Sequence, residues 1–148
     1  MEVIKEEKKS YRFPKEERLR HKSLVERLFR TGESFYEFPF RVIWQTLSET
    51  ELQNNFRNRA PEGIGRLQMM VTVPKKKRKK AVDRVLLRRR IRESYRLNRL
   101  GLKGSVENSE IRLLSVAFIY IHDKNLSYHS IEKKMQTIIN RIEEKISI

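Results

Sequence analysis

The sequence contains no cysteine, only five glycines and four prolines in 148 residues, and no long apolar run. Without cysteine there can be no disulfide, no thiolate nucleophile and no cysteine-ligated zinc. The stretch of about 20 apolar residues that a membrane-spanning helix needs is missing. The first residues, MEVIKEEKKSYRF, show no apolar segment followed by a cleavage site, so we expect no secretion signal. These absences predict a cytoplasmic protein without a membrane partner.

Groups that could carry out hydrolysis unaided are also scarce. The three histidines, His21, His122 and His129, are scattered and have no carboxylate partner motif. No glycine-rich phosphate-binding motif occurs. Clustered carboxylates or a paired base and nucleophile would be needed for cleavage by the protein itself. We therefore predict no catalytic residue, no metal bound by the protein and no small-molecule ligand.

Acidic residues are few relative to basic ones. The chain has 34 Lys and Arg residues against 19 Asp and Glu, a net charge of +15, with 38% hydrophobic and 36% charged residues. This composition predicts one globular domain over residues 1–148. Residues 75–99 alone hold thirteen cations and two acids. Because such a block repels itself, it indicates a polyanionic partner, and nucleic acid is the common one.

Hydrophobic periodicity predicts the order α-β-β-α-β-α, a single α+β domain with helices packed on a small sheet. An extended basic arm is expected over residues 1–22 and a long loop over residues 48–65. A Ser23–Glu26 capping box and Gly32 bound the first helix. The remaining elements are strands at 35–47, 67–73 and 113–121, a helix at 82–100 closed by Gly101 and Gly104, and a last helix containing Ile131 to Ile146.

The helix expected at 82–100 has two different faces. With residues spaced 100° apart, one arc holds mostly packing residues and the neighbouring arc holds arginines. The packing arc comprises Leu87, Ile91, Ser94, Tyr95 and Asn98, and the outward arc comprises Arg88, Arg89, Arg92, Arg96 and Arg99. Guanidinium groups bind phosphate oxygens bidentately and stack on bases. The helix is therefore predicted to present a cationic surface to RNA.

The basic segment allows other interpretations. An outward helix face laced with ion pairs would need acids, and only Asp83 and Glu93 lie nearby. The run at 75–80 by itself would also suit a flexible polycation or an address tag. A membrane-surface helix would need a broad apolar face. The second apolar strip here is only partial and consists of Val82, Leu86, Leu97 and Leu100.

Aromatic residues in the first helix and the first strand could stack on bases. Phe29, Phe35, Phe40 and Trp44 are the candidates. Stacking on an aromatic side chain is worth about 1–3 kcal/mol per base. Core packing is the alternative, at least as good for Phe40 and Trp44. Side chains alternate along a strand, so these residues cannot all point into one cleft.

Two stretches resemble the bacterial ribonuclease P protein subunit. The string VPKK…KKAVDRVLLRRRIRESYR is similar to the family's strand, basic loop and arginine-rich helix. The string KEERLRHKSLVERLFRTGESF resembles its opening arm and short helix. The likeness covers about residues 15–145. Arg84 matches the first arginine of the family's Arg-Asn-Arg, while Val85 and Leu86 stand where Asn and Arg are usual.

The resemblance implies the fold shared with domain 2 of ribosomal protein S5. It also implies a protein that assists a Mg²⁺-dependent catalytic RNA in removing the 5′ leader of precursor tRNA. A structural RNA-binding protein of ribosomal type, without a role in cleavage, is the alternative. Expected contacts to the catalytic RNA are Lys75, Lys76, Arg84, Arg88, Arg89, Arg92 and Arg96. Expected contacts to the leader are Val25, Phe29, Phe40 and Trp44.

Overall fold

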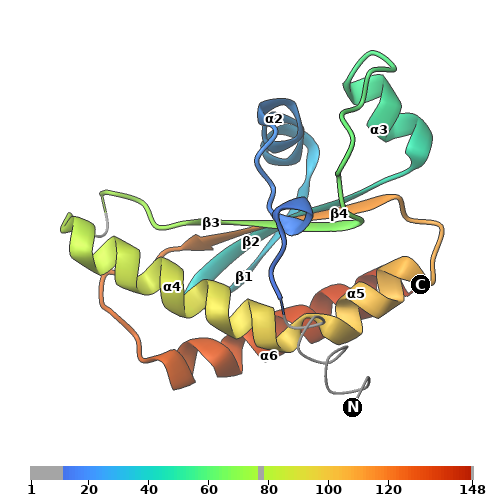
Figure 1. Cartoon of the computed structure of the whole chain (residues 1–148). Helices are drawn as coiled ribbons and strands as arrows, with labels where there is room; N and C mark the ends of the chain where they lie inside the picture. Colours follow the sequence, from blue (N-terminus) through green and yellow to red (C-terminus); the bar gives the residue numbers. More distant parts are fainter. Residues whose placement is uncertain (1–11, 77–78, 148) are drawn as a thin grey trace.

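The computed structural model describes residues 12–76 and 79–147, which form a four-stranded sheet with helices on both faces (Figure 1). The strands are β1 (Glu33–Glu37), β2 (Phe40–Leu47), β3 (Leu67–Thr72) and β4 (Leu113–Tyr120), in the spatial order β1-β2-β4-β3. The pairs β1–β2 and β2–β4 are antiparallel, and β3–β4 is parallel. The predicted α+β class, with helices packed on a small sheet, is confirmed.

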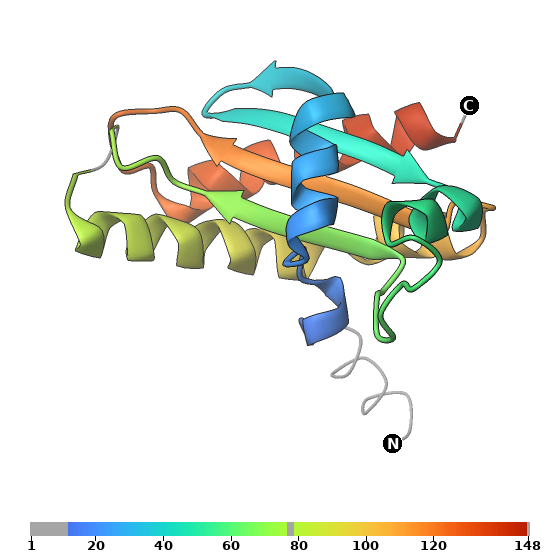
Figure 2. The ribbon, with the colours of Figure 1, turned by 90° about the horizontal axis from the view of Figure 1, so that it is seen from above.

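The helices divide unequally between the two faces of the sheet. They are η1 (Lys15–Glu17), α2 (Lys22–Thr31), α3 (Glu49–Asn55), α4 (Ala81–Asn98), α5 (Leu100–Glu107) and α6 (Tyr128–Ile146). The helices α4, α5 and α6 cover one face, and α2 crosses the other (Figures 1 and 2). This division gives two hydrophobic clusters, one on each side of the sheet.

Strand β4 lies in the middle of the sheet and faces both clusters. Its side chains alternate, so that Val116 and Phe118 pack toward α4 and α6 while Leu113 and Ala117 pack toward α2. All four are completely buried. The uninterrupted apolar run at 113–121 therefore predicted the strand correctly, because a strand buried on both faces needs no polar side.

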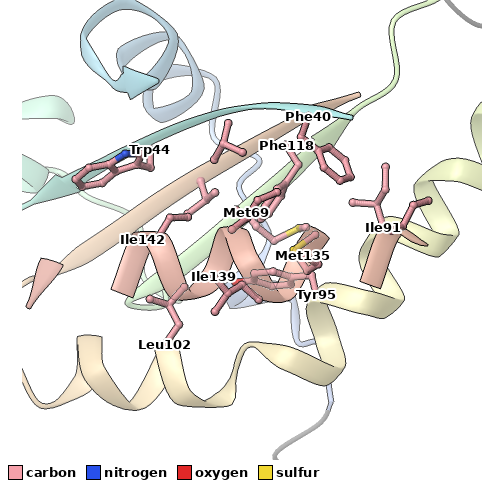
Figure 3. Close-up of a cluster of buried hydrophobic side chains, with 14 of the residues drawn as sticks. Phe40, Trp44, Met69, Ile91, Tyr95, Leu102, Phe118, Met135, Ile139 and Ile142 are labelled. Carbon is pink, nitrogen blue, oxygen red and sulfur yellow. The ribbon is translucent and has the colours of Figure 1, made fainter. Parts of the chain in front are cut away.

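The larger cluster fills the space between the sheet and the helices α4, α5 and α6 (Figure 3). Helix α6 contributes a stripe of apolar side chains at helical spacing, as predicted: Ile131, Met135, Ile138, Ile139 and Ile142. Helix α4 adds Leu87, Ile91 and Tyr95, each with no exposed surface. Burying these side chains fixes the rotation of α4 about its axis, and this rotation decides which of its residues face solvent.

The segment 35–47 is a hairpin and not the single strand that we predicted. Strand β1 ends at Glu37 and β2 begins at Phe40, and these two residues are paired across the turn. Pro39 stands in the turn because it has no N–H to donate to the ladder. The expectation that the first half lies at a sheet edge is confirmed, since β1 is the outermost strand.

The stretch 48–65 was predicted to be a loop throughout, and this was wrong for its first half. Helix α3 begins after Ser48, whose hydroxyl accepts from the N–H of Glu51 while the Glu51 carboxylate accepts from the N–H of Ser48. This reciprocal cap satisfies two free donors of the first turn. Leu52 anchors the helix in the smaller cluster with 1% of its surface exposed.

The capping box predicted at the start of α2 is not formed. The helix begins one residue earlier, with His21 at the N-cap position and no side-chain cap. The Ser23 hydroxyl instead accepts a 3.0 Å hydrogen bond from Asn55 at the end of α3. Gly32 ends α2 as predicted, and a Cβ there would lie 2.5 Å from the Leu28 carbonyl oxygen.

The helix predicted at 82–100 continues beyond its predicted end and is divided into two helices. Helix α4 ends at Asn98 and α5 continues from Leu100, so Gly101 and Gly104 lie inside a helix and do not end one. Glycine disfavours a helix interior by about 1 kcal/mol relative to alanine. Burial of Leu102 and Val106 in the larger cluster offsets that cost.

The arm predicted at 1–22 is only partly described, because residues 1–11 lie outside the described residues. Residues 12–21 run past the edge of the sheet and include the short helix η1. Arg18 forms a parallel bridge with Met69 of β3, and the Leu19 N–H donates to the Met69 carbonyl at 2.9 Å. The segment therefore covers the edge of β3.

Candidate nucleic-acid interface

The two faces of α4 are those expected from helical spacing. Leu87, Ile91 and Tyr95 are buried against the sheet and α6. The adjacent side bears four guanidinium groups that are partly or fully exposed, and we call them the arginine ridge: Arg88, Arg89, Arg92 and Arg96. The sequence placed these four residues on the correct side because packing of the apolar arc leaves only one side of the helix outward.

Arg99 was predicted to belong to the same outward row, and this prediction was wrong. Its side chain has no exposed surface, and its Nε lies 2.7 Å from Oε1 of Glu17. It also donates to the carbonyl oxygens of Arg12 and Arg96. Lys103 contacts the other Glu17 oxygen at 3.3 Å. The α4–α5 junction therefore binds the N-terminal segment, and this guanidinium is not available to a ligand.

Charge compensation differs among the arginines of the ridge. Arg96 pairs with Glu93 at 2.6 Å, which holds the pKa of the Glu93 carboxyl below its ordinary value. Arg88, Arg89 and Arg92 have no carboxylate partner within the part of the chain that the structure describes. Burial, together with the neighbouring cations Arg88 and Arg18, lowers the pKa of Arg92. An anion bound here would relieve this crowding of positive charges.

The other basic residues expected at the interface lie near the start of α4. Lys75 and Lys76 follow β3 and are exposed. Arg84 is partly buried and donates to the Lys79 carbonyl at 2.8 Å, a bond that ties the first turn of α4 to the preceding loop. These positions extend the positive charge from the ridge toward the end of β3.

Two grooves lie beside the ridge, and the sequence did not predict either. The ridge groove has a volume of about 400 Å³ and is lined by Phe13, Val85, Arg88, Arg89, Arg92, Glu93 and Arg96. The strand groove has a volume of about 500 Å³ and is lined by Phe13, Arg18, Leu19, Arg20, Met69, Met70, Val71 and Arg92. Phe13 and Arg92 line both. The two grooves thus join α4 to the edge of β3.

The N-terminal contribution to these grooves had one signal in the sequence, the basic character of residues 1–22. Arg18 and Arg20 come from that arm and are exposed. What the sequence could not show is the parallel bridge to β3, which brings the arm beside α4. The basic surface therefore combines residues about 70 positions apart in the chain, Arg18 and Arg92 among them.

The four residues expected at the leader do not lie together. Val25 and Phe29 are one helical turn apart on α2, where Phe29 is 44% exposed and Val25 is partly buried. Phe40 and Trp44 are 0% and 8% exposed and point into the larger cluster, on the opposite face of the sheet (Figure 3). Core packing, the alternative weighed for these two side chains, is what the structure shows. Neither ring is open to a base.

Comparison with known proteins supports the resemblance noted in the sequence. The family model described as Ribonuclease P matches residues 13–143. This chain belongs to the ribonuclease P family. Two curated relatives, the ribonuclease P protein components of two Porphyromonas gingivalis strains, are 29% and 30% identical over 128 residues. The alignments cover 86% of this chain and 84% of each relative.

Solved structures show the same fold. The Staphylococcus aureus RNase P protein has a TM-score of 0.57 and 17% identity, covering 85% of this chain and 94% of that one. A mutant of the S. aureus protein has the same TM-score, 16% identity and 97% coverage of both chains.

Family membership decides between the functions left open by the sequence. The chain is a protein subunit of ribonuclease P, an RNA-binding protein of tRNA processing within an endoribonuclease complex whose catalysis is carried out by RNA. The alternative, a structural RNA-binding protein of ribosomal type without a role in cleavage, does not agree with this family membership. In residues 12–76 and 79–147, no group of three or more metal-binding side chains occurs, and no helix has the length and apolar character needed to span a bilayer.

Proposed function

We propose that the arginine ridge binds the catalytic RNA of ribonuclease P. The observation that carries this proposal is that Arg88, Arg89 and Arg92 project from a rigid helix without acidic partners among the described residues. Each can neutralise one phosphate, and a helix buried on its other side holds them at fixed spacing. The proposed contact set is Lys75, Lys76, Arg84, Arg88, Arg89, Arg92 and Arg96.

The same proposal assigns the 5′ leader of precursor tRNA to the α2 face of the sheet. Phe29 offers a half-exposed ring there, and Val25 lies one turn away. The strand groove leads from this face to Arg92 and supplies Arg18 and Arg20 for the leader phosphates. An aromatic ring beside a basic groove is the usual arrangement for single-stranded RNA. Phe40 and Trp44 are not part of the proposed site.

The proposed division of labour leaves the chemistry to the RNA. The catalytic RNA, with bound Mg²⁺, hydrolyses the phosphodiester bond, while the protein places cations where phosphates crowd together and holds the leader. Neutralising those phosphates lowers the Mg²⁺ concentration that the RNA needs to fold and bind substrate. Such an enzyme works where precursor tRNA is made, so the proposal includes a cytoplasmic location.

Reconstitution with the cognate catalytic RNA tests this proposal. We expect leader removal at low Mg²⁺ only when both protein and RNA are present. The variant Arg88→Ala/Arg92→Ala should raise the Mg²⁺ requirement and weaken RNA affinity. Losing two phosphate contacts should reduce the slope of log K against log[salt] by about 1.5–2.

The variant Lys133→Ala/Lys145→Ala is the matched control, because it removes two exposed cations from α6 and gives the same net charge. It should keep the salt slope of the unmodified protein to within about 0.5. An unchanged slope in the Arg88/Arg92 variant would remove the ridge from the interface. Cleavage by protein free of RNA and of contaminating nuclease would contradict the division of labour.

A further inference from the structure

An apolar residue stands in the middle of the arginine ridge. Spacing of 100° per residue places Val85 about 20° from both Arg92 and Arg96 around the axis of α4. Its side chain is 48% exposed, and it lines the ridge groove. A β-branched apolar residue contributes nothing to phosphate binding. Because Val85 lines the groove together with these cations, a ligand in the groove would meet an apolar surface as well as positive charge.

Phe13 also lines the ridge groove, and contacts with neighbouring side chains set its position. Its ring meets the edge of Tyr95, with centroids 5.9 Å apart and an interplanar angle of 80°. The guanidinium carbons of Arg18 and Arg99 lie 5.6 Å and 5.9 Å from its centroid. Because Arg99 is itself bound to Glu17, the ring is held in place before any ligand arrives. Such preorganisation reduces the entropy cost of binding.

The charged groups of the groove limit further which class of ligand can bind there. Arg88 and Arg92 bring positive charge and have no acidic partner among residues 12–76 and 79–147, and Glu93 brings a carboxylate that is fixed by Arg96. A free phosphate would make no use of the Phe13 and Val85 walls. A nucleotide uses all three features, since its base is apolar on both faces, its exocyclic amine donates to a carboxylate, and its phosphate binds arginine.

We propose that the ridge groove, which Phe13 and Val85 line, is a subsite for one unstacked nucleobase of the bound RNA. The base packs against both apolar side chains, its exocyclic amine donates to Glu93, and its phosphate pairs with Arg88 or Arg92. Adenine, cytosine or guanine is accepted better than uracil, because each can donate an exocyclic amine to Glu93, whereas uracil could offer only its ring N3–H. The inference deepens the proposed function and rests on the ridge being in contact with RNA.

The first test compares Val85→Ser with Val82→Ser. Both valines are exposed on α4, but Val82, 79% exposed, does not line the groove. Affinity for the catalytic RNA is measured over a range of salt concentrations. We expect Val85→Ser to weaken binding about 3–10-fold with an unchanged salt slope, since lost apolar contact involves no counterion. Val82→Ser should stay within about 2-fold of the unmodified protein.

The second test identifies the nucleotide. Dimethyl sulfate probing of the catalytic RNA should show one adenine or cytosine, or a guanine by a base-pairing-edge reagent, protected by the unmodified protein. The same nucleotide should become reactive again in complexes of the RNA with Val85→Ser or Phe13→Leu. Phe13→Leu keeps apolar volume against Tyr95 and removes the ring. Urea denaturation midpoints equal to that of the unmodified protein would show that a loss of affinity in a variant is not a folding defect.

Two outcomes would overturn the inference. Equal affinities for Val85→Ser and Val82→Ser, with no nucleotide re-exposed, would mean that no base enters the groove. A reduced salt slope in Val85→Ser would mean that the mutation acts through the neighbouring phosphate contacts. In either case, a reduced slope for Arg88→Ala/Arg92→Ala leaves the proposed function standing. If that double variant also binds RNA normally, the proposed function itself fails.

Discussion

Arg99 is a charged side chain with no exposed surface, and one carboxylate compensates its buried charge. Glu17, 82 positions away in the sequence, supplies that carboxylate from the N-terminal segment. A buried ion pair contributes little relative to apolar residues of the same volume, but breaking it leaves an uncompensated buried charge. The pair therefore serves to fix the N-terminal segment, and with it Phe13, beside α4.

Removal of Arg99 alone should be costly, whereas removal of both partners should not. We expect Arg99→Met to lower the free energy of unfolding by about 3 kcal/mol, because Glu17 is left with Lys103 as its remaining cation. Glu17→Leu/Arg99→Met should recover most of that loss. Urea denaturation of the single and double variants measures the coupling. Additive losses in the double variant would show that the two side chains do not stabilise each other.

Tyr95 is a second residue whose ionisation is controlled by its surroundings. Complete burial, and then the negative charge of Glu17, raise the pKa of Tyr95 far above its ordinary value. Its hydroxyl has no hydrogen-bond partner among the described residues. The neutral form is thus the one compatible with the fold.

This raised pKa predicts a loss of stability at alkaline pH. The folded-state value lies above the unfolded value of 10.0, so the contribution is complete below pH 10 and is lost as the pH rises above it. The expected slope is about 1.4 kcal/mol per pH unit. In Tyr95→Phe the midpoint of urea denaturation should fall less between pH 9.5 and 11.5 than in the unmodified protein. The same pH dependence in both would contradict the prediction.

At the scale of elements, α2 and α4 present different surfaces to solvent from opposite faces of the sheet (Figure 1). Helix α4 offers guanidinium groups at a spacing fixed by its buried side. Helix α2 offers an aromatic ring, Phe29, on a helix whose Leu24 and Leu28 are buried against the sheet. Charge on one helix and an exposed ring on the other suit a folded RNA and a single strand respectively.

Replacing Phe29 with Ala should separate leader binding from folding. We expect a larger loss of affinity for precursor tRNA than for mature tRNA in the reconstituted complex, because only the precursor has a leader to stack. Since the ring is 44% exposed, the loss of stability should stay below the 3–5 kcal/mol typical of a buried Phe→Ala change. Filter binding of both tRNAs and a denaturant midpoint on the same variant provide the measurements.

Tyr36→Ala is a suitable control for Phe29, since Tyr36 is an aromatic on edge strand β1 with 66% of its surface exposed. It should affect the two tRNAs equally. Equal losses for both tRNAs in Phe29→Ala, together with a large drop in the midpoint, would assign Phe29 to packing.

At the scale of the whole molecule, the excess of positive charge has the largest effect on stability that we expect to depend on the partner. The net charge of +15 repels itself in the folded state. Most ion pairs among the described residues have at least one well-exposed partner, and such pairs are worth about 0–1 kcal/mol each. A bound polyanion removes this repulsion and adds stability by mass action. The free protein therefore has a lower free energy of unfolding than the protein bound to a polyanion.

Salt should partly replace the RNA in this respect. Raising NaCl from about 0.05 to 0.5 M shortens the range of electrostatic forces several-fold. We expect the urea midpoint of the free protein to rise, because repulsion among many cations outweighs the few exposed pairs that salt weakens. The buried Glu17–Arg99 pair should be little affected. A midpoint that falls with salt would show that attractive pairs outweigh the net charge.

The features that the sequence by itself determined are those that depend on short-range spacing and on composition. The continuous apolar run identified β4, the stripe from Ile131 to Ile142 identified α6, and the 100° spacing separated the two faces of α4. Each of these patterns repeats within a few residues, and burial acts on it directly. The density of cations on α4 likewise follows from composition alone.

Only the tertiary structure decided features that depend on contacts between distant segments. Arg99 lies beside Arg88 and Arg92 by spacing, yet it turns inward because Glu17 meets it there. Three Ser-x-x-Glu sequences occur, at Ser23, Ser34 and Ser48, and within the described part of the chain only the one at Ser48 caps a helix. Ser34 lies in β1, and Ser23 lies inside α2, where its hydroxyl is bonded to Asn55. Phe40 and Trp44 face the core and Phe29 faces solvent because of the side on which each element packs. The free energy of these arrangements comes from pairs of residues that no local pattern brings together.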